Sequence, residues 1–214
     1  MMSIKPIKIM IAHESEETIN LLQNILDAQP DMTVILSTRN GNEIVEAVKS
    51  QTPDIILLGI NLEEMNGADV TRHVMKNKSA TIIIVSNHLK EKQSLKVFDA
   101  LSVGAVTVVP NPVGMTNQSD AIQHLLSTIK IHQNTSYHHE PTDKTSAICN
   151  DLSTQQKHTR HQVDVVGIGA STGGPKVLKH IFDKLNQEHM PPIAVVLHIS
   201  DGFLPNLINW LKFS

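Results

Sequence analysis

The chain has 214 residues, 18 Lys and Arg against 21 Asp and Glu, and one cysteine, Cys149. One cysteine excludes a disulfide framework and a cysteine-rich zinc site. The charge balance of −3 leaves no basic excess for a polyanion-binding face, so we expect no nucleic-acid partner. Apolar runs are too short to span a bilayer and no secretory signal opens the chain, so we expect a cytoplasmic protein without membrane insertion.

The first 131 residues alternate short apolar runs with amphipathic stretches. The runs predict strands at Ile7–Ala12, Thr33–Ser37, Asp54–Gly59, Thr81–Ser86 and Ala105–Val109. Helical spacing predicts helices at Ser15–Ala28, Gly41–Ser50, Gly67–Asn77, Glu91–Ser102 and Asn117–Ile131. Nearly continuous apolar strands are typical of a parallel sheet covered on both faces. We therefore predict an α/β, doubly wound, five-stranded domain over residues 1–131.

A polar stretch at residues 132–162, rich in Ser, Thr, Gln and His, predicts a flexible linker. Residues 163–214 then predict one βαβ unit and a last helix, with strands Val163–Ile168 and Ile193–Leu197, a helix Pro175–Leu185, and a helix that starts near Phe203. So small a unit leaves a sheet edge and apolar faces uncovered, and we expect it in isolation either to be loose or to need a partner surface. We expect Trp210, on the last helix, to be a core residue left partly uncovered.

Ligands of open α/β sheets bind where the strands end, so the residues that follow each strand carry the information on function. The runs PDIILLGINLEEMNG (53–67), IIIVSN (82–87) and GAVTVVPNP (104–112) resemble the receiver domain of bacterial response regulators, which has a flavodoxin-like fold. The resemblance implies a phosphoryl group on an Asp after the third strand, Mg²⁺ held by two acids after the first strand, and a Ser or Thr and a Lys that contact the phosphoryl oxygens.

The receiver pattern is largely lost at these positions. Gly59 stands at the phosphoacceptor position and has no side chain to phosphorylate, while His13 and Asn111 stand where the family has an acid and the Lys. Only Glu14 and Ser86 keep the pattern, so we predict no phosphoacceptor and no bound metal. Asp54 begins its strand and should lie at the opposite end of the sheet. Two alternatives remain: a receiver fold kept as a packing or docking module, or residual phosphorylation at another acid such as Glu63 or Glu64.

A second motif lies between the strand and the helix that open the C-terminal unit. Residues 169–173 read G-x-S-x-G, the spacing of a nucleophile elbow that presents Ser171 beside the first N–H groups of a helix. A serine hydroxyl needs a base, and His198 stands at the end of the next strand. In a parallel βαβ unit both residues lie at one edge of the sheet, which could bring them within hydrogen-bond reach.

Two other interpretations of the glycine-rich turn stay open. The start Gly167-Ile168-Gly169 resembles a dinucleotide loop, but the third glycine falls one place late, at Gly173, and the following strand ends in His198 rather than an acid. The turn could also serve packing alone. We predict no cofactor.

The run IGASTGGP (168–175), followed by HISDGF (198–203), resembles the catalytic domain of CheB-type chemotaxis protein-glutamate methylesterases, whose domain order of receiver, linker and catalytic domain also matches. The resemblance implies that Ser171 is the nucleophile, that His198 is the general base, and that the N–H of Thr172 helps to form the oxyanion hole. It implies hydrolysis of glutamate methyl esters and deamidation of glutamines on chemoreceptors, with methylated chemoreceptors and the chemotaxis histidine kinase as partners.

The third member of the family's triad is an Asp far downstream, whereas this chain ends at Ser214, soon after His198. We therefore expect residues 163–214 to be the N-terminal part of a truncated methylesterase domain. Asp183 and Asp201 do not correspond to the family acid, and we predict surface or turn roles for both. The alternative to an enzyme is a non-enzymatic pseudo-receiver docking module or an inactive remnant.

Overall fold

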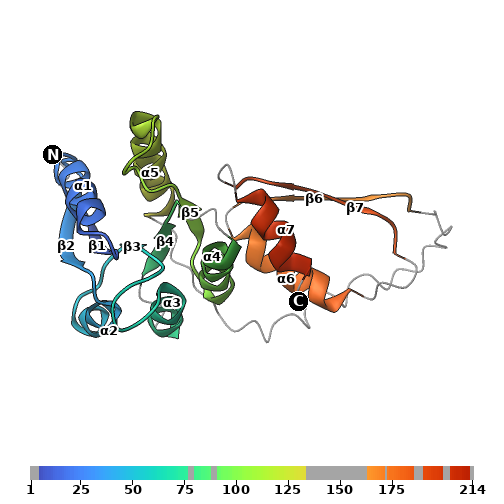
Figure 1. The fold of residues 1–214 in the computed structure, drawn as a ribbon, viewed down its shortest axis with the longest axis horizontal. Helices are drawn as coiled ribbons and strands as arrows, with labels where there is room; N and C mark the ends of the chain where they lie inside the picture. Colours follow the sequence, from blue (N-terminus) through green and yellow to red (C-terminus); the bar gives the residue numbers. More distant parts are fainter. Residues whose placement is uncertain are drawn as a thin grey trace.

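The computed structural model describes residues 5–76, 80–87, 91–133, 163–171, 173–185, 190–199 and 203–212. These residues form a five-stranded parallel sheet and a two-stranded parallel sheet, with helices packed on both (Figure 1). The strands are β1 (Ile7–Ala12), β2 (Met32–Thr38), β3 (Ile55–Leu58), β4 (Thr81–Val85), β5 (Thr107–Val109), β6 (Val166–Ala170) and β7 (Ile193–Leu197). The helices are α1 (Glu16–Asp27), α2 (Gly41–Ser50), α3 (Gly67–Lys76), α4 (Glu91–Val103), α5 (Gln118–His132), α6 (Gly174–Lys184) and α7 (Leu204–Lys212).

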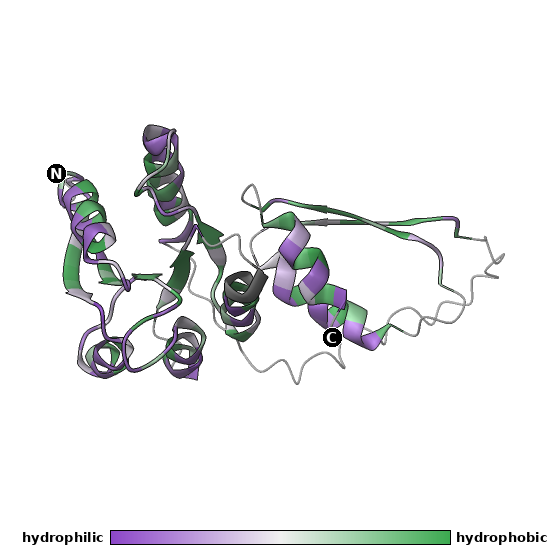
Figure 2. Ribbon diagram, in the orientation of Figure 1, coloured by the Kyte–Doolittle hydropathy of each residue, from purple (hydrophilic) through white to green (hydrophobic). Residues whose placement is uncertain are grey.

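The first unit, from β1 to α5, has the strand order β2-β1-β3-β4-β5, which confirms the predicted doubly wound α/β fold. Helices α1 and α5 cover one face of its sheet, and α2, α3 and α4 cover the other (Figure 1). Alternate residues of β1 serve the two cores: Ile9 and Ile11 pack with Leu22 of α1, whereas Met10 packs with Ile44 of α2. The strands are apolar along their length and the helices are apolar on one side (Figure 2). The sheet is therefore buried on both faces, as predicted.

Side-chain caps set where the first two helices begin. The Ser15 hydroxyl accepts a hydrogen bond from the Thr18 N–H at 3.3 Å, and the Asn40 side chain accepts one from the Asn42 N–H at 2.8 Å. Each bond satisfies an N–H group that lacks a partner within the helix. Together they hold the turns that follow β1 and β2 at the carboxyl edge of the sheet.

The predicted strand Val163–Ile168 is wrong in its bounds, since β6 runs from Val166 to Ala170. Parallel pairing with β7 begins at Val166 opposite Ile193 and ends at Ala170 opposite Leu197. The later half of β6 consists of small residues that carry no β-branched signal, whereas the apolar valines before it form no ladder. The correction places the end of the strand directly before Ser171.

The second unit, from β6 to α7, packs against the first unit through its helices. Helices α6 and α7 both contact α4 and lie between α4 and the two-stranded sheet (Figure 1). The expectation that Trp210 is partly uncovered is wrong, because its side chain is only 8% exposed and its ring stacks on Phe98 of α4. The first unit thus supplies the partner surface that the sequence calls for. Residues 134–162 of the predicted linker lie outside the described residues.

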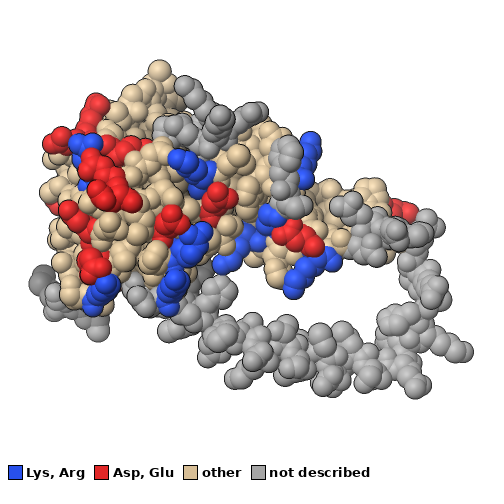
Figure 3. All heavy atoms as spheres, turned by 60° about the horizontal axis from the view of Figure 1, so that its bottom comes forward, with Lys and Arg blue, Asp and Glu red and all other residues tan. Residues whose placement is uncertain are grey.

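Charged side chains of both signs are interspersed on the face of the molecule drawn in Figure 3, and no continuous basic surface covers that face. Ion pairs such as Arg39–Glu63 and Lys49–Glu46 join neighbouring charges over the first unit. Exposed pairs of this kind contribute about 0–1 kcal/mol each to stability. None of the described helices combines the length and the apolar character that a bilayer crossing requires.

Acidification is expected to destabilise the chain through His132, the last residue of α5. Its side chain is 6% exposed, its Nδ1 atom is buried and has no hydrogen-bond partner among the described residues, and burial lowers the pKa of His132. The folded-state pKa lies below the unfolded value of about 6.5. The contribution of the neutral ring to the free energy of unfolding is therefore complete above about pH 6.5 and is lost as the pH falls through the folded-state pKa. Urea unfolding at pH 7.5 and 5.5 should show a smaller loss of stability in His132→Leu than in the wild type. Equal losses would contradict this assignment.

Candidate active site

The two residues that the sequence pairs as nucleophile and base follow neighbouring strands. Ser171 comes directly after β6 and His198 directly after β7, and the His198 N–H donates to the Ala170 carbonyl at 3.0 Å. Since Ala170 pairs with Leu197, Ser171 and His198 occupy matching places at one edge of the sheet, as predicted. Both residues are exposed, and within the described residues no hydrogen bond joins their side chains. Catalytic hydrogen bonds of this type are often long before substrate binds.

Two glycines shape the turn that carries Ser171. Gly173 adopts a left-handed conformation, with φ of 73°, at the N-cap of α6, where most side chains would be strained. At Gly174 a Cβ atom would lie 2.6 Å from Leu197 Cδ1 and 2.9 Å from Ala170 Cβ, so only glycine lets the helix start this close to the strands. The Gly174 N–H donates to the Ser171 carbonyl at 2.8 Å and closes the turn. Thr172, the predicted oxyanion-hole residue, lies outside the described residues.

His198 faces a cleft shared between the two units. The cleft has a volume of about 630 Å³, and the first unit lines it with residues from the ends of β4 and β5 and from α5, including Ser86, Asp120 and His124. Ile199 and Phe203 line it together with His198. His198 therefore lies at the carboxyl edge of the first unit's sheet, in a cleft that it shares with Ser86 and with residues of α5.

Asp183 and Asp201 are two acids that follow Ser171 in the sequence. Asp183 is exposed near the C-terminal end of α6, where Lys179 Nζ lies 2.8 Å and 3.0 Å from its two carboxylate oxygens. Because α6 starts at the Ser171 turn, its far end lies away from His198, and Asp183 has the surface role predicted for it. Asp201 lies outside the described residues.

At the receiver-type edge of the first unit, side chains that follow β1 lie close to Gly59. Gly59 follows β3 and is buried, and a Cβ atom there would lie 2.5 Å from Glu14 Oε2 and 2.9 Å from His13 Cδ2. His13 is 5% exposed, and its Nδ1 accepts a hydrogen bond from the Ser15 N–H at 3.0 Å. The side chains after β1 therefore fill the space that the side chain of an aspartate at position 59 would need.

Asn111, at the position of the family's Lys, forms a hydrogen-bonded network instead of offering a positive charge. Asn87 and Asn111 exchange two hydrogen bonds of 2.8 Å and 2.7 Å between side chain and backbone, and Asn111 Nδ2 donates to the Thr18 hydroxyl at 2.8 Å. Asn87 and Thr18 are residues that sequence reasoning missed, since nothing local marks either as a partner of residue 111. Ser86 is buried and lines the cleft together with Asn87, and its N–H donates to the Val109 carbonyl.

The residues at this edge do not fit the Mg²⁺ of a phosphorylatable receiver. Mg²⁺ prefers carboxylate oxygens, and here Glu14 is the one carboxylate among the three positions, beside His13 and Gly59. Among the described residues no group of three or more His, Cys, Asp or Glu side chains could hold a metal ion. Asp54 lies at the opposite edge, as predicted, where its carboxylate accepts from the Lys8 N–H at 2.8 Å.

The two alternative acids lie in the loop that follows β3. Glu63 forms an ion pair of 2.8 Å with Arg39, and its backbone pairs with the start of α2. Glu64 is exposed and adopts a positive φ of 63°. Neither position replaces the side chain that Gly59 lacks at the end of the strand.

Comparisons with known proteins agree with this division of the chain. The response regulator receiver domain family matches residues 9–123, and the CheB methylesterase family matches residues 166–214. A protein-glutamate methylesterase/protein-glutamine glutaminase of Geobacter metallireducens is 30% identical over 97% of this chain and 60% of its own length. One from Methanospirillum hungatei is 31% identical over 97% of this chain and 61% of its own length. The chain thus spans about 60% of the length of these relatives.

Among solved structures, the response regulator domain of Thermotoga maritima CheB is similar to the first unit. It is 28% identical with a TM-score of 0.54, and the match covers 61% of this chain and 98% of that domain. The fold of the first unit and the family match over residues 9–123 agree, and the chain therefore belongs to the response regulator receiver domain family; residues 166–214 are similar to the CheB methylesterase family.

Proposed function

We propose that this chain is a protein-glutamate methylesterase of chemotaxis signalling, with Ser171 as nucleophile and His198 as general base. The observation that carries the proposal is the placement of Ser171 directly after β6, shortly before α6, and of His198 directly after the paired strand β7. The names of the relatives support the same activity and add glutamine deamidation. The substrates are then methylated glutamates and glutamines of cytoplasmic chemoreceptor segments.

The reaction follows from these positions as an acyl transfer. Ser171 Oγ attacks the ester carbonyl carbon while His198 takes the hydroxyl proton. The oxyanion accepts hydrogen bonds from backbone N–H groups at the start of α6. By family resemblance, the N–H of Thr172 is one of these donors. The bond to the methoxy group breaks as His198 returns the proton, and methanol leaves. Water then attacks the acyl-enzyme with His198 again as base, which releases the glutamate and restores Ser171.

The receiver is proposed to act in this chain as a packing module and not as a phosphorylation switch. Gly59 cannot form an acyl phosphate, and Glu14 and His13 occupy the adjoining space. A phosphoryl group normally biases such a domain between two states, and an equilibrium shifts only with a ligand that distinguishes them. Any control by the chemotaxis histidine kinase would therefore have to act through binding.

Methanol release from a methylated chemoreceptor peptide tests the proposal. The 214-residue chain should release methanol faster than its Ser171→Ala variant, because the alanine removes the attacking oxygen while it leaves an exposed turn intact. Equal rates would contradict the enzyme and favour the non-enzymatic docking module, for which the apolar contact of α7 with α4 is the supporting observation.

A further inference from the structure

The second unit shares an apolar core with α4 of the receiver. Phe203, Leu207 and Trp210 are 2%, 3% and 8% exposed, and they belong to one continuous cluster with residues of the receiver core, among them Val97 and Phe98. These three residues recur at spacings of four and three, so they form one stripe along the start and body of α7. The stripe packs on α4, and Leu197 of β7 packs against the same cluster.

Directional contacts fix the position of this stripe. The rings of Phe98 and Trp210 stack with centroids 5.5 Å apart and planes inclined by 24°. Lys179 Nζ of α6 lies 5.8 Å from the Trp210 ring centroid, within the range of a cation–π contact. The Gly173 N–H, at the start of α6, donates to the Val106 carbonyl of the receiver at 3.1 Å. Both helices of the second unit are thereby tied to the receiver.

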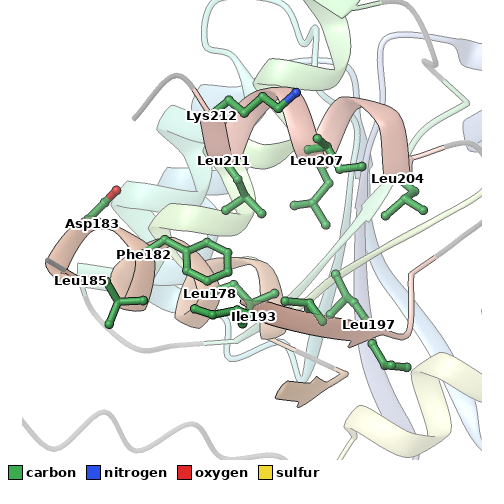
Figure 4. Close-up of a pocket in the computed structure, with 13 residues that line it drawn as sticks. Leu178, Phe182, Asp183, Leu185, Ile193, Leu197, Leu204, Leu207, Leu211 and Lys212 are labelled. Atoms are coloured by element: carbon green, nitrogen blue, oxygen red, sulfur yellow. The ribbon is translucent and has the colours of Figure 1, made fainter. Parts of the chain in front are cut away.

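The rest of the second unit has little core of its own. Among its described residues, the buried apolar side chains are Pro175, Leu178 and the three residues of the stripe. A groove of about 1180 Å³ lies between α6, α7 and β7, lined by side chains such as Phe182, Ile193 and Leu211 (Figure 4). Two of the residues that line it remain open to solvent, since Val196 is 76% exposed and Ile208 is 44% exposed. The burial that could hold this unit together is therefore concentrated where it meets α4.

We propose that α4 of the receiver is the folding platform of residues 166–212: these residues keep their fold only while α7 is packed on α4, and the two units unfold together. The partner that this apolar stripe fits is thus the receiver of the same chain. The inference is independent of the proposed activity, since it concerns folding and needs no catalytic turnover.

Hydrogen exchange of the 214-residue chain tests the platform with two neighbouring substitutions. Leu207→Ala removes a buried side chain of the stripe, whereas Ile208→Ala removes an isomeric side chain that is 44% exposed on the same helix, and both side chains also line the groove. We expect amides of both α6 and α7 to exchange at least about tenfold faster in Leu207→Ala, and to change by less than about threefold in Ile208→Ala. Equal effects of the two substitutions would overturn the proposal.

A second measurement does not depend on any change in the second unit. Trp210 is the chain's one tryptophan, so its fluorescence reports the contact with α4 during urea unfolding, while far-UV circular dichroism reports the whole chain. Leu22→Ala weakens the receiver from the opposite face of its sheet. The fluorescence and dichroism midpoints should coincide in the wild type and should shift equally in Leu22→Ala. A fluorescence midpoint that stays unchanged in Leu22→Ala would show an independently folded second unit.

Discussion

The variants Ser171→Ala, His198→Ala and the double variant are expected to hydrolyse a glutamate methyl ester at one common residual rate, about 10²-fold below that of the 214-residue chain, which itself lacks the family's triad Asp. The prediction rests on the proposed function. A nucleophile and its base act as a unit, so removal of either one stops the same step and removal of the second costs little more. Methanol release at saturating substrate measures the three rates.

Asp183→Asn is the matched control for these substitutions. It also changes a residue of the second unit, but one whose carboxylate is paired with Lys179 near the far end of α6. We expect its rate to stay within about twofold of the wild type, because an exposed ion pair of this kind contributes little to stability. If the double variant lost activity by the product of the two single losses, Ser171 and His198 would act independently and the proposed mechanism would be wrong.

The sequence predicts most of the fold because the local signals and the tertiary structure agree. The bounds of β1, β7 and α2 are as predicted, since apolar runs and an asparagine cap mark them. β6 is misplaced because its paired residues are mostly small, and pairing with β7, not side-chain type, decides its ends. Periodicity describes one segment at a time and contains no information on which strands pair.

The environment of Trp210 could not be predicted for a related reason. The helical spacing places Trp210 on α7, but the ring that covers it belongs to Phe98, more than a hundred residues earlier. Asn111 is a similar case, since its partners Asn87 and Thr18 meet it only in the folded sheet edge. At the candidate site, the motif spacing identifies Ser171 and His198 as the candidate nucleophile and base. The pairing of β6 with β7 then shows that both residues lie at the same edge of the two-stranded sheet.

The receiver edge shows what a sequence comparison leaves out. That Gly59 lacks a phosphorylatable side chain can be read from the sequence, but the occupation of the vacated space by Glu14 and His13 cannot. The substitution at position 59 and its neighbours therefore form one packed arrangement. A single reverse substitution would have to displace these side chains before it could restore a receiver site.

Gly59→Asn and Gly59→Asp are both expected to destabilise the chain, the first by about 1–3 kcal/mol and the second by roughly a further 1 kcal/mol. Any Cβ atom at position 59 would lie 2.5 Å from Glu14 Oε2 and 3.2 Å from His13 Cα, and the second contact is with backbone that cannot rotate away. This crowding exceeds the roughly 0.4–1 kcal/mol that loss of glycine's freedom in the unfolded chain contributes. Urea unfolding at pH 7 gives the free energies.

The matched pair separates volume from charge, because asparagine and aspartate have the same shape and only the aspartate places a second carboxylate beside Glu14. When Glu14 is replaced by glutamine, the additional loss of unfolding free energy in Gly59→Asp should therefore disappear. The loss of unfolding free energy in Gly59→Asn should persist. If Gly59→Asp were as stable as the wild type at pH 7, the space beside Glu14 would be open. The edge could then accept an aspartate, and the filled pocket inferred from Gly59, Glu14 and His13 would be refuted.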